Sequence, residues 1–173
     1  LGDVYKRQVN EPNKVGYVVE IDPLNPNSTP KKHTALGRFK HENAELVISK
    51  DGRIVVYMGD DERGEYLYKY VSNESMNKEK DKSTLLSNGN LYVAKFNDNF
   101  TGEWLLLDTQ TTGLSSKAEV CIFTRLAASK VGATTMDRPE WIASNPKKNE
   151  VCCCLTNNKN RGIKTNKGGD KVD

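Results

Sequence analysis

The chain has 173 residues, of which 36% are hydrophobic, and its mean hydropathy is −0.70. This length is enough for one domain with a buried core, and seven Tyr, four Phe and two Trp argue against wholesale disorder. The net charge of +3 is the balance of 26 basic and 23 acidic residues spread along the chain, which does not indicate nucleic-acid or membrane binding. No apolar run approaches the roughly 18 residues that a transmembrane helix needs.

The two ends of the chain differ from its middle. Residues 1–8 have no hydrophobic period, and their segment DVYKRQ looks like a translated sequencing-library end, so we interpret them as non-native rather than as a natural polar terminus. This interpretation implies that upstream sequence is missing. Residues 163–173 predict a polar tail or a truncated loop. Residues 9–162 are then expected to form one partial domain.

In chain order, short apolar and β-branched segments separated by turn residues predict antiparallel strands. The first strand, residues 15–21, stops at Asp22-Pro23, where proline cannot continue a ladder. Asp51-Gly52 lies between residues 46–49 and 53–58 and predicts a hairpin. Further strands are expected at residues 65–71, 90–96 and 103–107, one helix at residues 116–131, and a last strand pair at residues 139–144 and 150–156.

Strands at this spacing fit a sandwich, a barrel or a propeller. Residues 15–21, residues 45–58 with 65–71, and residues 92–107 can each be described as part of a four-stranded blade. Acidic residues also fall at strand ends, where the central channel of a propeller would collect them. We therefore predict an all-β fold that is part of a β-propeller with one helical insertion.

The four cysteines are Cys121 and the consecutive Cys152, Cys153 and Cys154. Neither group has the spacing of a zinc site or of a disulfide framework. On a strand, Cys152 and Cys154 would share a face that Cys153 does not. We interpret all four as small apolar packing residues, with a metal or redox role as the alternative.

Two clusters place carboxylates where a cation could bind. The segment Gly37-Arg38-Phe39-Lys40-His41-Glu42 offers the carboxylate of Glu42 beside cationic groups. Asp60 and Asp61 follow an apolar strand, so their carboxylates emerge together and suit a hard cation such as calcium. A solvated acidic turn explains the same residues without a ligand.

A third cluster, residues 136–140, places an arginine between carboxylates. Arg138 could clamp two phosphate oxygens, and Glu140 could share a metal ion, although a surface salt bridge explains both residues. Asn157 and Asn158 could supply amide oxygens to calcium or form an Asx turn. The chain contains no G-x-S-x-G elbow, H-E-x-x-H motif or phosphate loop, so carboxylates near an arginine favour metal-assisted phosphoryl or similar ester hydrolysis.

Several longer motifs occur in a fixed order over residues 9–162. They are YVVEIDP, TALGRFKHE, KDGRIVVYMGDDER, LYVAKFNDN with TGEW, AEV-x-I-x-TRLAA and VGAT-x-MDRPE, followed by NPK and LTNN. In this order they resemble the PhoX family of alkaline phosphatases. The resemblance implies a β-propeller, export by the twin-arginine route to the periplasm or the medium, and hydrolysis of small phosphate monoesters by a cluster of calcium and iron ions.

The resemblance also implies roles for individual residues. The matching positions make metal ligands of Glu42, Asp60, Asp61, Glu140, Asn157 and Asn158, and make Arg138 the phosphate contact. The ions would neutralise the phosphate oxygens during an in-line displacement, with Arg138 assisting.

The chain also departs from the family pattern. A cysteine and glutamate ligand segment expected before Val9 is absent, Trp141 replaces a usual acidic residue, and residues 152–154 replace a usual Tyr, Val and Ala strand. With downstream segments also missing, we expect an incomplete, inactive piece of a monomeric enzyme. Two other functions stay open, a non-enzymatic calcium-stabilised propeller that binds a partner and a lactonase-like propeller hydrolase.

Overall fold

This computed structural model describes residues 11–165, in which β-strands make up most of the regular structure. The predicted all-β character is therefore confirmed at the level of a mostly β protein. The interpretation of residues 1–8, and that of residues 163–173 beyond residue 165, lie outside the described residues. No helix among residues 11–165 is both long and apolar enough to cross a bilayer.

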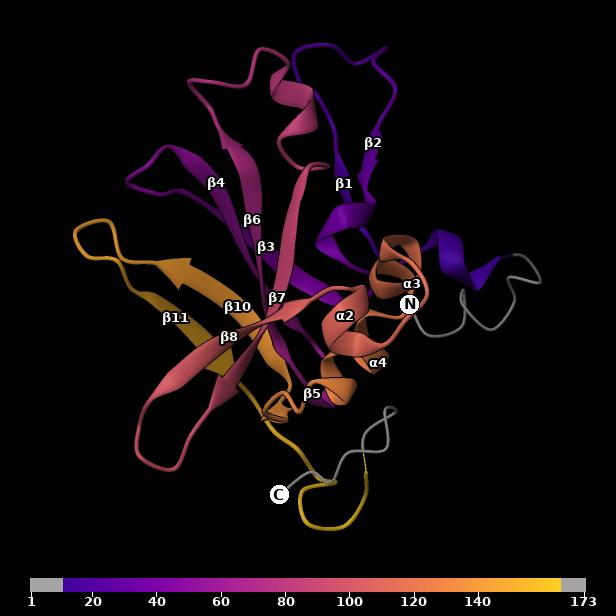
Figure 1. Cartoon of the computed structure of the whole chain (residues 1–173), viewed down its shortest axis with the longest axis vertical. Coiled ribbons are helices and arrows are strands. Elements are labelled where there is room, and N and C mark those ends of the chain that lie inside the picture. The colour runs from indigo at the N-terminus through magenta and orange to yellow at the C-terminus, as the bar shows by residue number, and fades with distance from the viewer. Residues whose placement is uncertain (1–10, 166–173) are drawn as a thin grey trace.

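The main sheet is a five-stranded antiparallel meander (Figure 1). Its strands, in spatial order, are β3 (His41–Ile48), β4 (Arg53–Asp60), β6 (Leu67–Ser75), β7 (Gly89–Phe96) and β8 (Gly102–Leu107). The predicted hairpin is confirmed, because Ile48 pairs with Ile54 and Gly52 takes a φ of 81° in the turn between them. Apart from residues 63–65, the strands within residues 45–58 with 65–71 and within residues 92–107, described from the sequence as parts of blades, belong to this one sheet.

Three two-stranded ladders accompany the main sheet. They are β1 (Val18–Glu20) with β2 (Lys31–His33), β5 (Arg63–Glu65) with β9 (Met136–Asp137), and β10 (Pro139–Ser144) with β11 (Val151–Leu155). The last pair confirms the strand pair predicted at the end of the chain. The very short strands β2, β5 and β9 have too few residues to show a period of two, and the sequence did not predict them.

Strand β10 packs against β3 and β4 of the main sheet (Figure 1). The side-chain amide of Asn43 on β3 makes both contacts that a neighbouring strand would make. It accepts a hydrogen bond from the backbone N–H of Ile142 at 3.0 Å and donates to the Ile142 carbonyl at 2.8 Å. The side chain of Ile142 is fully buried, and the Asn43 amide provides the hydrogen-bond partners of both its backbone groups on the side of β10 that faces β3.

A helical segment follows β8 and covers one face of the sheet (Figure 1). It consists of α2 (Thr109–Thr112), α3 (Lys117–Ile122) and α4 (Thr124–Lys130), and 3-10 turns occur at Pro12–Lys14, Thr34–Leu36 and Lys82–Thr84. The prediction of one helix over residues 116–131 was wrong in one respect, because Phe123 has ψ 42° and ends α3 before α4 begins. The sequence also did not predict α2, a single turn whose N-cap Asp108 accepts a hydrogen bond from the Thr111 N–H.

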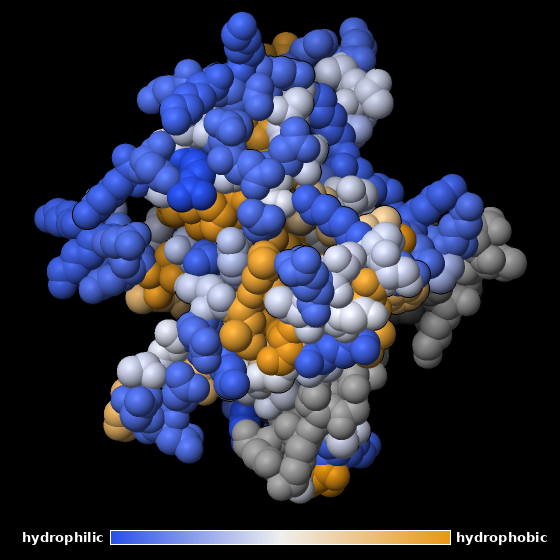
Figure 2. Space-filling model, in the orientation of Figure 1, coloured by the Kyte–Doolittle hydropathy of each residue, from blue (hydrophilic) through white to orange (hydrophobic). Residues whose placement is uncertain are grey.

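The core lies between this helical segment and the sheet. Alternate residues of the chain entering β6, Tyr66, Tyr68 and Tyr70, are fully buried there against helical residues such as Ala127. A smaller cluster of Leu67, Ala94 and Ile142 lies on the opposite face, under β10. Hydrophilic side chains cover the outer loops of the molecule (Figure 2).

Candidate functional site

The candidate site lies where the turn after β4 meets the link between β9 and β10. Asp61 and Glu62 lead from β4 into β5, and the Glu62 N–H donates to the Asp60 carbonyl at 2.7 Å. Strand β5 then pairs with β9, with Arg63 opposite Asp137. This short ladder brings together two segments that are far apart in sequence.

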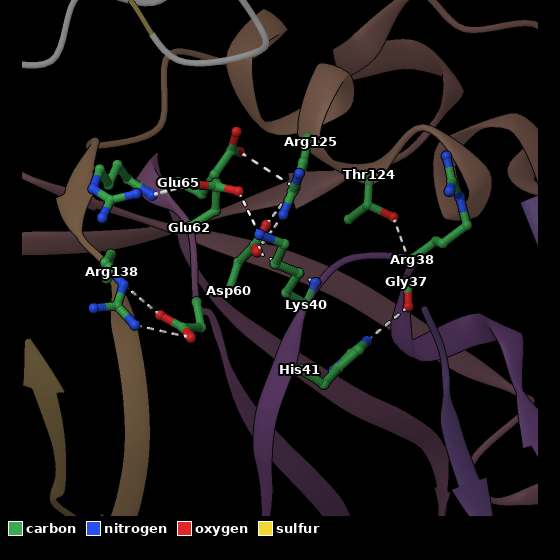
Figure 3. Close-up of polar contacts among 12 residues, drawn as sticks. Gly37, Arg38, Lys40, His41, Asp60, Glu62, Glu65, Thr124, Arg125 and Arg138 are labelled. Atoms are coloured by element: carbon green, nitrogen blue, oxygen red, sulfur yellow. Dashed lines mark hydrogen bonds and ion pairs between the residues drawn. The ribbon is translucent and has the colours of Figure 1, made fainter. Parts of the chain in front are cut away.

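Arg138, labelled in Figure 3, forms ion pairs with two carboxylates, those of Asp61 and Glu140. Its Nε donates to Asp61 Oδ1 at 2.9 Å and its Nη2 to Asp61 Oδ2 at 3.2 Å, and Nη2 is 3.0 Å from Glu140 Oε1. The hydrogen bond to Asp61 is the main reason that the pKa of Arg138 is raised, so the guanidinium stays charged. Nη1 makes no hydrogen bond to a residue in the described part of the chain and points away from Asp61, which leaves donors for an anionic ligand.

The backbone at Arg138 has an uncommon conformation. Its φ of 56° lies in the left-handed region, which a non-glycine residue adopts at a cost of about 1–3 kcal/mol. The strain is held by the two flanking strands, since β9 ends at Asp137 and β10 begins at Pro139. The direction of the Arg138 side chain is therefore determined by this backbone conformation as well as by its rotamer.

Gly59 allows the Arg138 segment to approach β4. A Cβ at this position would lie 2.6 Å from the Pro139 carbonyl oxygen and 2.7 Å from that of Glu140. Backbone atoms cannot rotate away as a side chain can. The glycine in the motif YMGDDER thus lets β10 cross β4 at contact distance, beside the two aspartates.

Asp60, predicted as a metal ligand, is fully buried and is bound by a residue from the helical segment. Arg125 on α4 donates to both carboxylate oxygens, with Nε to Oδ2 and Nη2 to Oδ1 each at 2.6 Å. Glu65 lies 3.8 Å from Arg125 Nε and is also fully buried. Burial raises the pKa of Asp60, and the Arg125 guanidinium opposes this increase. A cation that used the Asp60 oxygens would have to displace Arg125.

The loop 37–40 is joined to the same turn. The Lys40 N–H donates to Asp60 Oδ1 at 3.3 Å, the Lys40 carbonyl accepts from the Asp61 N–H at 3.0 Å, and Lys40 Nζ is 2.5 Å from Glu62 Oε2. Gly37, with a φ of 85°, allows the loop to approach α4, since a Cβ there would lie 2.9 Å from Thr124 Oγ1. Residues 37–42 and the turn at Asp60 and Asp61, which the sequence presents as two separate clusters, are therefore hydrogen-bonded to each other.

His41 is half-buried beside this loop and stacks on Phe39 with ring centroids 3.7 Å apart. Its Nε2 lies 3.0 Å from the Gly37 carbonyl oxygen, and burial lowers the pKa of His41 to about 4. The imidazole is neutral at pH 7, and its contacts are those of a packing residue.

The other predicted ligands lie around this centre. Glu42 is exposed on β3. The hydroxyl of Thr156 donates to Glu140 Oε1 at 2.9 Å, which places the end of β11, and hence Asn157, next to the Arg138 cluster. Asn158 Oδ1 accepts from the Asn160 N–H at 2.9 Å, which is the Asx turn considered as the alternative.

The metal ions implied by the resemblance can be compared with this donor set. Asp61 and Glu140 have the hard oxygen donors that calcium prefers. However, residues 11–165 contain no group of three or more His, Cys, Asp or Glu side chains that could hold a metal ion. The described residues therefore do not form a metal centre by themselves.

Arg125 and Lys40 were not among the predicted site residues. Arg125 had a sequence signal, since it is a cation at helical spacing from Cys121 and Ala128, which are both buried. A charged residue on the apolar face of a short helix requires a buried partner, and Asp60 provides it. Lys40 uses mainly its backbone, which no side-chain pattern reveals.

The fold and the site together define a mostly β protein in which a partly exposed arginine is paired with two carboxylates. The sequence matches the profile of alkaline phosphatase PhoX over residues 2–172, so the chain belongs to the PhoX family. It is also similar to the solved structure of Pseudomonas fluorescens PhoX in complex with vanadate, a transition state analogue, with 48% sequence identity and a TM-score of 0.80. This match covers 92% of the chain but only 31% of the P. fluorescens chain. No curated protein matches the sequence.

Proposed function

We propose that the chain is part of a metal-dependent phosphomonoesterase that releases inorganic phosphate from organic phosphate esters. The observation that carries this proposal is the position of Arg138, whose charge is fixed by Asp61 and Glu140 while Nη1 points away from Asp61. Membership of the PhoX family and similarity to a structure with bound vanadate support it. The proposed substrates are small phosphate monoesters.

In this proposal, Arg138 binds and orients the phosphoryl group. A guanidinium donates along fixed directions and can hold a phosphate oxygen through transfer, which lowers the energy of a charged transition state. Asp61 and Glu140 keep the guanidinium in place, and Asp60 with Arg125 keeps Asp61 in place. Calcium and iron, when bound, would supply Lewis acid chemistry at the same phosphate oxygens.

The remaining parts of the proposal concern the whole protein. We propose that residues 9–162 belong to a β-propeller domain. Glu42, Asp61, Glu140, Asn157 and Asn158 are proposed ligands. Asp60 would join them only if the ion displaced Arg125, which binds both of its carboxylate oxygens. Export to the periplasm or the medium and a monomeric state are proposed from family membership.

The test is hydrolysis of p-nitrophenyl phosphate by the protein expressed from its complete gene, with calcium added and then chelated. We expect calcium-dependent turnover and bound iron. Arg138→Ala should lower kcat/KM by about 10²–10³ with an unchanged circular dichroism spectrum. Arg53→Ala, which removes an exposed arginine paired with Asp51, is the matched control and should keep full turnover. Unchanged turnover in Arg138→Ala would refute the proposed role.

The same preparation separates the alternatives. Stable folding with calcium but without turnover would favour a binding propeller. Hydrolysis of lactones in place of phosphate monoesters would favour a lactonase-like enzyme. The isolated 173-residue chain is expected to show no turnover, and measurable hydrolysis by it would contradict that expectation.

A further inference from the structure

The three consecutive cysteines on β11 do not share one environment. Cys153 faces the cluster of Leu67, Ala94 and Ile142, and burial raises the pKa of its thiol to about 11. Cys152 and Cys154 are free thiols and are exposed on the other face of the strand. The interpretation of all the cysteines as packing residues was therefore wrong for these two.

The exposed face leaves space around the Cys152 thiol. Cys152 lies opposite Ala143, whose side chain is a single methyl group, and Ile142 and Cys153 pair on the inner face. Trp141 lies where the register of the ladder shifts, between Pro139 and Ile142, and its side chain is exposed. The two thiols thus lie one residue apart on an open surface of a two-stranded ladder.

The spacing along the strand determines what the two thiols can bind. Residues i and i+2 of a strand have Cα atoms about 6.6 Å apart and side chains that point the same way. That separation is near the upper limit of about 6.8 Å for a disulfide, so direct closure would distort the strand. A zinc–thiolate bond is about 2.3 Å long, so one ion with bonds of this order can bridge sulfur atoms about 4.6 Å apart.

We propose that Cys152 and Cys154 form a two-thiolate site for a soft, thiophilic metal ion, with Cu(I) as the defining case. Soft thiolates select Cu(I) over calcium, and a linear two-coordinate ion needs no third protein ligand. Both thiols lose their protons to solvent when the ion binds, and no electron is transferred. The site is chemically distinct from the oxygen donors around Arg138, and its existence does not depend on phosphatase activity.

The test is anaerobic competition for Cu(I) between the purified 173-residue chain and the chromophoric chelator bicinchoninate. We expect one Cu(I) per chain. Cys152→Ser and Cys154→Ser should each weaken binding by about 10²–10⁴-fold, because each removes the intramolecular second ligand. Cys153→Ser, which changes the neighbouring inward-facing thiol, is the matched control and should keep the affinity of the wild type.

Two further results would overturn the site. Equal affinity in Cys152→Ser and the wild type would show that one thiol is sufficient. One Cu(I) per two chains, with a dimer in sedimentation, would show that the ion links separate molecules.

Quenching of Trp141 gives a second measurement, since Cu(I) should reduce the fluorescence of the wild type and have little effect on Trp141→Phe. Because the chain contains only two Trp, the remaining signal comes from Trp104, which packs against the cluster of Leu67, Ala94 and Ile142 under β10.

Discussion

Arg125 and Asp60 form a bidentate ion pair, in which both carboxylate oxygens of Asp60 accept hydrogen bonds of 2.6 Å from the Arg125 guanidinium. Asp60 is 0% exposed and Arg125 is 19% exposed, so the pair joins α4 to the end of β4 within the core. The next residue along the chain, Asp61, binds Arg138. The position of the proposed phosphate contact therefore depends on an ion pair that does not touch the ligand.

Removal of Arg125 should strongly destabilise the protein. Arg125→Met leaves a buried carboxylate without its cation and should lower the free energy of unfolding by about 3–5 kcal/mol, measured by urea denaturation. Arg53→Met, at an exposed pair with Asp51, should cost at most about 1 kcal/mol. The double variant Asp60→Leu/Arg125→Met should recover part of the loss, because buried Glu65, 3.8 Å from Arg125 Nε, still loses its cation. Equal effects at Arg125 and Arg53 would contradict the importance of the buried pair.

Because the backbone at Arg138 is left-handed, a glycine variant should be more stable there than an alanine variant, which is the reverse of the usual order. Both Arg138→Ala and Arg138→Gly lose the contacts with Asp61 and Glu140, but only glycine relieves the strain at φ 56°. Arg138→Gly should therefore be more stable than Arg138→Ala by about 1 kcal/mol in urea denaturation. At Glu103, an exposed residue of β8, alanine should be the more stable replacement. The same order at both positions would argue against strain at Arg138.

A methyl group at Gly59 should separate β10 from β4. Gly59→Ala places a Cβ against two backbone oxygens at 2.6 and 2.7 Å, so the strands must shift, at a cost of about 1–3 kcal/mol. The shift should also displace Arg138 and lower phosphatase turnover of the complete protein. Gly102→Ala is the control, because its tightest contact, at 3.1 Å, is a ring carbon of the exposed Phe96. Full turnover in Gly59→Ala would show that the close approach is not required.

Lys69 should give the protein a measurable pH dependence in the alkaline range. Its ammonium group lies 4.5 Å from the Trp104 ring centroid and 5.1 Å from that of Tyr92, and desolvation lowers the pKa of Lys69 to about 8. Between pH 8 and about 10.5, the unfolded chain keeps this proton while the folded chain loses it, so this group makes stability rise with pH.

Comparison with Lys69→Met isolates this contribution. At pH 7 the variant should gain stability relative to the wild type, because it has no charge to desolvate, and the difference should shrink as the pH rises to about 10.5. Thermal unfolding of both proteins across this range measures it. A difference that stays constant with pH would show that Lys69 keeps its ordinary pKa in the fold.

Much of the fold could be predicted because strand and turn signals are local. Asp51-Gly52 defined one hairpin, and residues 139–144 and 150–156 pair as β10 and β11, almost as expected. The break at Phe123 could not be predicted, because it depends on tertiary contact. The Thr124 hydroxyl there donates to the Cys121 carbonyl at 2.8 Å and accepts from the Arg38 N–H at 3.0 Å.

The candidate site was predicted as separate clusters, and the structure shows how some of them meet. The motif GDDER suggested equal roles for Asp60 and Asp61, whereas one is buried with Arg125 and the other binds Arg138. Burial differs because successive residues at a strand end face opposite sides, and which side holds the core depends on the whole sheet. Pairing of β5 with β9 likewise involves too few residues to leave a sequence pattern.

The ladder between β5 and β9 also bears on where insertions can be tolerated. It holds Asp61 close to Arg138, so the chain between the two strands is a long loop whose two ends are joined by the ladder. The entropy cost of closing such a loop grows only logarithmically, by about 0.6 kcal/mol for each doubling of its length. Insertions in the surface connections at residues 76–88 or 97–101 can therefore change the outline of the molecule while the distance between these two side chains stays the same.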